Sequence, residues 1–174
     1  MQDILNKAAQ VRLVIFDVDG VLTDGSLYLG DDGQEYKAFH SQDGHGMVML
    51  QNSGVQIAII TGRSSQVVAT RMASLGINHL YQGQRDKRPA YEELKDKLGL
   101  DDSQIAYVGD DVVDLPVMSQ VGLAIAVQDA HGFTKQHAHW ITASAGGRGA
   151  AREVCELIME AQGKLQDHLQ TYLQ

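Results

Sequence analysis

Short apolar runs alternate along this chain with longer stretches of helical character. The runs contain mainly Val, Ile, Leu, Ala and aromatic residues, which favour strands. They span residues 13–16, 56–60, 79–82, 105–109, 123–127 and 139–142. Strands that alternate with helices are typical of a parallel sheet, so the pattern predicts an α/β fold with helices flanking the sheet.

Residues that favour the starts and ends of helices support this interpretation. The stretch 64–76, SSQVVATRMASLG, opens on serines and ends at a glycine, and 88–99, RPAYEELKDKLG, has an early proline and a final glycine. Serine and proline favour helix starts, whereas glycine favours the position just after a helix. We predict helices in both stretches and a further helix over about 149–161.

Two segments do not fit this alternation of strands and helices. Residues 26–39, SLYLGDDGQEYKAF, carry an Asp-Gly pair flanked by residues that favour strands. This pattern predicts a β-hairpin that protrudes from the sheet after the first strand. The glutamine-rich C-terminus is weakly amphipathic, and we expect a flexible tail over about 163–174 that is disordered or docks on a neighbouring molecule.

Composition limits the possible cellular locations and binding partners of the protein. The 174 residues, of which 44% are hydrophobic, suit a single domain over 1–174. A net charge of −8 argues against nucleic-acid partners, which require a cationic surface. Cys155 is the single cysteine, and no signal-peptide or membrane-length apolar run is present. We therefore expect a soluble cytoplasmic protein without a membrane partner.

Polar groups follow four of the predicted strands. Asp17 and Asp19 end the first, and their side chains point the same way because they lie two residues apart in an extended segment. The other ends carry Thr61 and Arg63, then Lys87, then Asp110, Asp111 and Asp114. Ligands of open parallel sheets bind at this edge. We expect these groups to meet in one site.

This set of groups suits phosphoryl transfer. Asp17 and Asp110 are suitable Mg²⁺ ligands, while Lys87 and Thr61 would stabilise charge on a phosphoryl group. A carboxylate can attack phosphorus, and a second one, Asp19, can transfer protons. Each group alone has a structural alternative, such as a capped turn, a helix N-cap or a solvated charge run. The combination favours catalysis.

Four motifs carry a family resemblance: DVDGVLTDG, IITGR, the DK pair at 86–87, and YVGDDVVDLPVM. In this order they resemble the motifs of the haloacid dehalogenase superfamily of aspartate-nucleophile phosphatases, which implies a Rossmann-like sheet. The resemblance assigns Asp17 as nucleophile and metal ligand, and Asp19 as general acid/base whose backbone carbonyl also faces the metal. Thr61 and Lys87 would hold the phosphoryl group, Asp110 would complete the Mg²⁺ ligands, and Asp111 and Asp114 would support them.

The spacing of the motifs leaves no room for a cap domain. Between Asp19 and Thr61 only the hairpin and one helix fit, and the interval from Lys87 to Asp110 is shorter still. The chain thus resembles capless members of the superfamily, which implies a homotetramer whose hairpins pack together and whose C-terminal tail reaches an adjacent site. By the same resemblance, the residues that contact substrate are Asp19, His40, Ser41, Gln42, Asp43, Gly44, Val48, Arg63, Arg71 and Lys87.

The function that this resemblance implies is Mg²⁺-dependent hydrolysis of a small sugar acid phosphate. The expected substrate is an acidic octulosonate phosphate of lipopolysaccharide precursor synthesis. A nine-carbon, sialic-type acid phosphate remains an alternative. A non-catalytic oligomerisation module is a second alternative, which predicts damaged motifs, whereas every catalytic position of this chain is intact.

Overall fold

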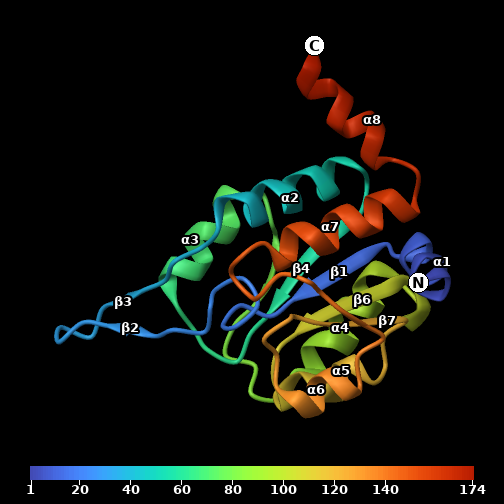
Figure 1. Ribbon diagram of the computed structural model, residues 1–174. Coiled ribbons are helices and arrows are strands. Elements are labelled where there is room, and N and C mark those ends of the chain that lie inside the picture. Colours follow the sequence, from blue (N-terminus) through green and yellow to red (C-terminus); the bar gives the residue numbers. More distant parts are fainter.

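A six-stranded parallel sheet forms the centre of the protein (Figure 1). The computed structural model describes all 174 residues. The strand order is β5-β4-β1-β6-β7-β8. The strands span Leu13–Phe16 (β1), Gln56–Ile60 (β4), His79–Tyr81 (β5), Ile105–Gly109 (β6), Leu123–Ala126 (β7) and Trp140–Ile141 (β8). All six predicted apolar runs are therefore strands.

Helices cover both faces of the sheet (Figure 1). Helices α2 (Ser41–Asn52), α3 (Gln66–Ser74) and α7 (Ala150–Ala161) lie on one side, while α4 (Arg88–Leu98), α5 (Leu115–Met118) and α6 (Gly132–Gln136) lie on the other. Every residue of β1, β6 and β7 is buried. A strand that is buried on both faces needs apolar side chains throughout, which explains the continuous runs in the sequence.

The predicted helix ends agree with the structure to within about two residues. Pro89 lies in the first turn of α4, and Gly99 ends that helix with a φ of 63°, a left-handed conformation that glycine adopts without strain. Ser65 precedes α3, and α7 begins at Ala150. The sequence thus located these three helices correctly.

The predicted hairpin is present. Strands β2 (Tyr28–Leu29) and β3 (Glu35–Tyr36) pair antiparallel, with Tyr28 opposite Tyr36, and project from the body of the protein at the left of Figure 1. No cap domain follows either β1 or β5. The hairpin exposes four large apolar side chains, those of Leu27, Tyr28, Leu29 and Tyr36.

The two ends of the chain form helices that the sequence pattern did not predict. Helix α1 (Gln2–Gln10) packs near α7 and buries Ala8. At the other end, α8 (Leu165–Gln170) and the 3₁₀ turn η3 (Thr171–Leu173) lead away from the sheet. Two further 3₁₀ turns are η1 (Asp102–Gln104) and η2 (Val112–Asp114). Flexibility of residues 163–174 stays a prediction. None of the helices has the length and apolar character needed to cross a membrane.

A buried carboxylate joins α2 to α7. Asp43 is 2% exposed, and its carboxylate accepts hydrogen bonds from the backbone N–H groups of Arg152, at 2.9 Å, and Gly149, at 3.4 Å. The first N–H groups of a helix have no partner within the helix, so a side chain from elsewhere must satisfy them. Asp43 therefore fixes the start of α7 against α2.

We predict that Asp43→Ala lowers the free energy of unfolding by roughly 1 to 3 kcal/mol, because it leaves buried N–H groups without an acceptor. Asp43→Asn should cost less, since the amide oxygen still accepts from Arg152. Urea denaturation of both variants measures the difference. An alanine variant as stable as the parent would show that Asp43 does not anchor α7.

Candidate active site

The carboxyl ends of four neighbouring strands meet around one cavity. Strand β1 lies between β4 and β6, so their following loops are adjacent, and the loop after β5 reaches in from the side of β4. The cavity has a volume of about 360 Å³, and Val113 is the one hydrophobic residue among those that line it. The lining residues are Asp17, Asp19, Thr61, Gly62, Arg63, Gln84, Arg85, Lys87, Asp110, Asp111 and Val113. The predicted convergence of the motifs is thus present in the structure.

Lys87 is the buried cation of this cavity. It directly precedes α4 and is 2% exposed. Its Nζ lies 3.0 Å from Asp17 Oδ2, 2.6 Å from Asp114 Oδ1 and 3.0 Å from the Tyr107 hydroxyl. Burial alone would lower the pKa of Lys87, but the two carboxylates outweigh it and raise that pKa. The ammonium therefore stays charged and fixed beside Asp17.

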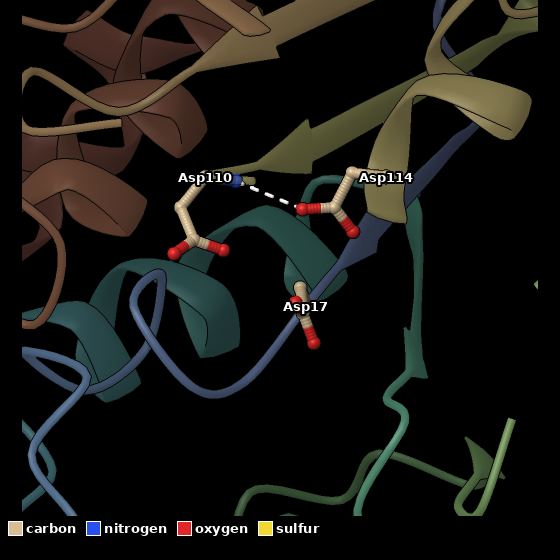
Figure 2. Close-up of side chains that lie close together, drawn as sticks. All are labelled: Asp17, Asp110 and Asp114. Atoms are coloured by element: carbon tan, nitrogen blue, oxygen red, sulfur yellow. Dashed lines mark hydrogen bonds between the residues drawn. The ribbon is translucent and has the colours of Figure 1, made fainter. Parts of the chain in front are cut away.

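Asp114 is fully buried beneath the cavity and all its contacts are internal. Oδ1 accepts hydrogen bonds from Lys87 and, at 2.7 Å, from the Tyr107 hydroxyl. Oδ2 accepts from the backbone N–H groups of Asp110, at 2.9 Å, and Asp111, at 3.2 Å; Figure 2 shows the contact with Asp110. Asp114 therefore orients both Lys87 and the loop that carries Asp110.

Asp17 and Asp110 are held closer than two ionised carboxylates favour. Oxygen atoms of Asp17, Asp110 and Asp114 all lie within 4.8 Å of one another (Figure 2). Burial, followed by repulsion from Asp114, raises the pKa of Asp17 to about 6 despite the nearby Lys87. Burial and repulsion from Asp114 and Asp17 raise the pKa of Asp110 to about 8. A divalent cation between Asp17 and Asp110 would relieve this repulsion.

The donor set suits Mg²⁺. This ion prefers oxygen ligands and commonly takes one or two carboxylates, with waters and substrate oxygens completing an octahedron. Asp114 is already saturated by hydrogen bonds, so Asp17 and Asp110 are the carboxylates that face the cavity. Gly20 makes room for them: it has a φ of 89°, and a Cβ atom there would lie 2.0 Å from Asp110 Oδ2. Any other residue at position 20 would displace the Asp110 side chain.

Asp19 lines the cavity and pairs with the base of the hairpin. Its Oδ1 is 2.5 Å from Lys37 Nζ, and its Oδ2 is 4.0 Å from Arg63 Nε. Glu35 lies 3.0 Å from both Lys37 Nζ and Arg63 Nη2. Asp19 is therefore the carboxylate of this cavity that is tied to the hairpin rather than to Lys87.

Thr61 and Asp111 occupy the remaining predicted positions. Thr61 directly follows β4, is 2% exposed, and donates its backbone N–H to Tyr81. Asp111 is exposed and accepts the N–H of Val112 at 2.7 Å, which caps η2. Asp111 thus acts as a helix cap, and the same residue also lines the cavity.

The predicted substrate contacts divide into three groups. Arg63 lines the cavity, with a side chain that is 44% exposed. His40, Asp43, Gly44 and Arg71 instead line a smaller recess that has no room for a water molecule, where the Arg71 guanidinium lies 5.9 Å from the centre of the Phe39 ring. Ser41 and Gln42 are exposed in the first turn of α2, and Val48 is half-buried on that helix. Substrate contact by these residues stays a prediction.

Sequence reasoning missed several residues of the site. Tyr107 is fully buried within β6, where its hydroxyl contacts Lys87 and Asp114, and an aromatic residue in an apolar run gave no signal of that role. Gln84 and Arg85 line the cavity beside Lys87, and their position next to a motif residue was the available clue. Lys37 lies 18 residues from Asp19 along the chain, and no spacing rule links the two.

The cavity can support a displacement at phosphorus. Asp17 offers a carboxylate at its floor, and the Lys87 ammonium beside it can neutralise an incoming anion. A second carboxylate, that of Asp19, lies at the rim and can exchange protons. These are the groups that a two-step hydrolysis of a phosphate ester requires.

Comparisons with known proteins agree with this chemistry. A family model described as haloacid dehalogenase-like hydrolase matches residues 76–154. The 3-deoxy-D-manno-octulosonate 8-phosphate phosphatase of Escherichia coli strain K12 is 51% identical over 165 residues, which cover 95% of this chain and 88% of the relative. The crystal structure of the phosphatase of the same name from Yersinia pestis has a TM-score of 0.93 at 52% identity and covers 94% of this chain and 89% of that one.

A second solved structure holds ligands. The 3-deoxy-D-manno-octulosonate 8-phosphate phosphatase of Moraxella catarrhalis was crystallised with a magnesium ion, a phosphate ion and a KDO molecule. It is 44% identical to this chain, has a TM-score of 0.97, and each chain covers 99% of the other.

The raised pKa values of Asp17 and Asp110 predict how cation binding depends on pH. A cation must displace the protons that these carboxyls retain, so Mg²⁺ should bind more tightly as the pH rises through about 6 and about 8. Thermal unfolding with increasing MgCl₂ at pH 6 and pH 8 measures this. We expect the larger increase in melting temperature at pH 8, and none in Asp110→Asn. Equal increases at both values would contradict the proposed ligand pair.

Proposed function

The chain belongs to the haloacid dehalogenase-like hydrolases, and we propose that it removes the phosphate of 3-deoxy-D-manno-octulosonate 8-phosphate in lipopolysaccharide precursor synthesis. The observation that carries this proposal is the convergence of Asp17, Lys87 and Asp110 in one polar cavity. The 51% identity, which extends over 95% of the chain, supports the choice of substrate. The Moraxella catarrhalis phosphatase, which binds magnesium, phosphate and KDO, supports Mg²⁺ as the cofactor.

Asp17 is the proposed nucleophile. Its carboxylate attacks the phosphorus atom, the bond to the sugar oxygen breaks, and a phospho-aspartyl intermediate forms. Lys87 holds Asp17 at 3.0 Å and neutralises charge on the phosphoryl oxygens, which Thr61 also contacts. Mg²⁺ held by Asp17 and Asp110, with the backbone carbonyl of Asp19 as a further ligand, would supply additional positive charge at the phosphoryl group.

Asp19 is the proposed general acid and base. In the first step it donates a proton to the departing sugar oxygen, and in the second step it accepts a proton from the water that hydrolyses the phospho-aspartyl group. Its position at the rim of the cavity, with a side chain that is 20% exposed, lets it reach both the leaving oxygen and water. In the segment after β6, Asp111 and Asp114 are proposed to support Asp110 as a metal ligand.

The sugar acid is proposed to bind at the open side of the cavity. Arg63 lines that side and can pair with the carboxylate of the substrate through two N–H groups. The remaining proposed contacts are residues 40–44, Val48 and Arg71. They belong to α2, to the residue directly before it and to α3, and they lie outside the cavity of a single chain. We propose a cytoplasmic location, in line with the single buried cysteine.

The test is phosphate release from purified protein with the eight-carbon ester and with a nine-carbon sialic-type acid 9-phosphate. We expect Mg²⁺-dependent release with the higher kcat/KM for the eight-carbon ester. Asp17→Asn should abolish turnover while the protein remains folded, because an amide cannot form the acyl phosphate. Faster turnover of the nine-carbon ester would change the substrate assignment. An active Asp17→Asn protein would show that Asp17 is not the nucleophile.

We also propose that a single domain over residues 1–174 assembles as a homotetramer through its hairpins. The exposed apolar residues Leu27, Tyr28, Leu29 and Tyr36 support this, because a patch of large apolar side chains on a projecting hairpin favours association. A cavity without a cap also needs a neighbouring subunit to exclude water. The C-terminal tail, which leads away from the sheet, is proposed to reach the site of an adjacent subunit.

Leu29→Asp should dissociate the assembly, since it places a charge in the proposed interface. Light scattering coupled to gel filtration measures the mass. A chain truncated after Gln162 is the comparison: we expect it to remain assembled but to show altered turnover. A Leu29→Asp protein with the parental mass would exclude the hairpin as the interface, and unchanged kinetics after truncation would exclude a role for the tail.

A further inference from the structure

The base of the hairpin contributes a buried lysine to the active site. Lys37 directly follows β3, and only 1% of its side chain is exposed. Its Nζ lies 2.5 Å from Asp19 Oδ1 and 3.0 Å from Glu35 Oε1. Burying an ammonium is costly unless charged or polar partners compensate, and here two carboxylates do so. The side chain is therefore held in a single place, directed at Asp19.

The contact orients one particular oxygen of Asp19. Lys37 engages Oδ1, while Oδ2 has Arg63 Nε at 4.0 Å and no closer charged partner. A carboxylate with one oxygen anchored cannot turn freely about its side-chain bonds. The Oδ2 atom is thus presented in a defined direction, as transfer of a proton to a leaving oxygen requires.

Glu35 makes the arrangement rigid. It accepts from Lys37 and from Arg63 Nη2, each at 3.0 Å, so Asp19, Lys37, Glu35 and Arg63 form one connected charge network. Two members come from the hairpin, one follows β1 and one follows β4. The hairpin is consequently joined to two residues of the cavity lining.

We propose that Lys37 is the positioning residue for Asp19: it holds the carboxylate in the orientation that delivers a proton to the leaving group. The inference rests on the proposed function, because it assumes that Asp19 acts as the general acid. Lys37 itself does not line the cavity and touches no reacting atom. Through Lys37 the hairpin would contribute to catalysis, in addition to any role in assembly.

The leaving group provides a selective test. A sugar alkoxide leaves only with a proton, whereas p-nitrophenolate leaves without one, so only the sugar ester depends on a well-oriented general acid. We compare the parent and Lys37→Met on 3-deoxy-D-manno-octulosonate 8-phosphate and on p-nitrophenyl phosphate, both with saturating Mg²⁺. Methionine has a similar length and fills the buried space.

The expected result is a fall in kcat/KM for the sugar ester of about tenfold, part of the roughly 100-fold or more that a general acid contributes. We compare kcat/KM because it reports release of the leaving group and not the later hydrolysis of the phospho-aspartyl group, which both esters share. The kcat/KM for p-nitrophenyl phosphate should change by less than about threefold, since its leaving group needs no proton. In an Asp19→Asn background, Lys37→Met should have no further effect. A fall of the same size for both esters, no fall for the sugar ester, or an additive loss in the double variant would overturn the proposal.

Two controls separate this role from general damage. Lys95→Met removes a lysine that also bridges two carboxylates, Glu92 at 2.9 Å and Asp102 at 3.1 Å, but on α4 away from the cavity. It should leave both rates unchanged. The Mg²⁺-induced rise in melting temperature should persist in Lys37→Met, which would show that Asp17 and Asp110 are intact.

The design also separates this inference from the proposed substrate. If the parent releases no phosphate from the octulosonate ester, the proposed function fails at that point. The same comparison is then made with an alkyl phosphate that the parent does hydrolyse, because the argument depends only on the basicity of the leaving oxygen.

Discussion

The burial of one ammonium group among carboxylates is the interaction on which this site depends. Lys87 is almost inaccessible to water and is stable there only because Asp17, Asp114 and the Tyr107 hydroxyl surround its Nζ. Asp17 directly follows β1, Asp114 lies in η2 and Tyr107 lies within β6. Correct packing of the strands is therefore a condition for compensating the buried charge, and the charge in turn fixes the proposed nucleophile.

The carboxylates outnumber their cation. Asp17, Asp110 and Asp114 lie within one small volume, and Lys87 balances only part of their charge, which is why burial and mutual repulsion raise the pKa values of Asp17 and Asp110. Such an arrangement costs stability in the absence of a cation and favours Mg²⁺ when it is present. Backbone N–H groups and Lys87 saturate Asp114, so the unbalanced charge is concentrated on the two carboxylates that face the cavity.

A second group of charges lies at the rim and has a different origin. Asp19 and Arg63 follow strands of the sheet, but Lys37 and Glu35 come from the hairpin, which replaces a cap domain in the interval between the first two motifs. The proposed general acid is thus connected to the projecting element, and the proposed nucleophile to the core. A link between subunit assembly and proton transfer would follow naturally from this division, because the same hairpin carries the exposed apolar residues proposed to join subunits.

The order of apolar runs along the chain was sufficient to predict all six strands, three flanking helices and the hairpin, because strands buried on both faces need continuous apolar sequence and turns need particular residues. The motif spacing likewise placed Asp17, Thr61, Lys87 and Asp110 at one edge of the sheet. Helix α1 was not predicted, although its apolar residues, which include the buried Ala8, recur at helical spacing. The contacts of Tyr107 and Lys37, and the separation of Arg71 from the main cavity, were decided only by tertiary structure. Sequence pattern records which side chains avoid water, whereas the partner that a buried charge finds depends on which segments the fold brings within a few ångströms.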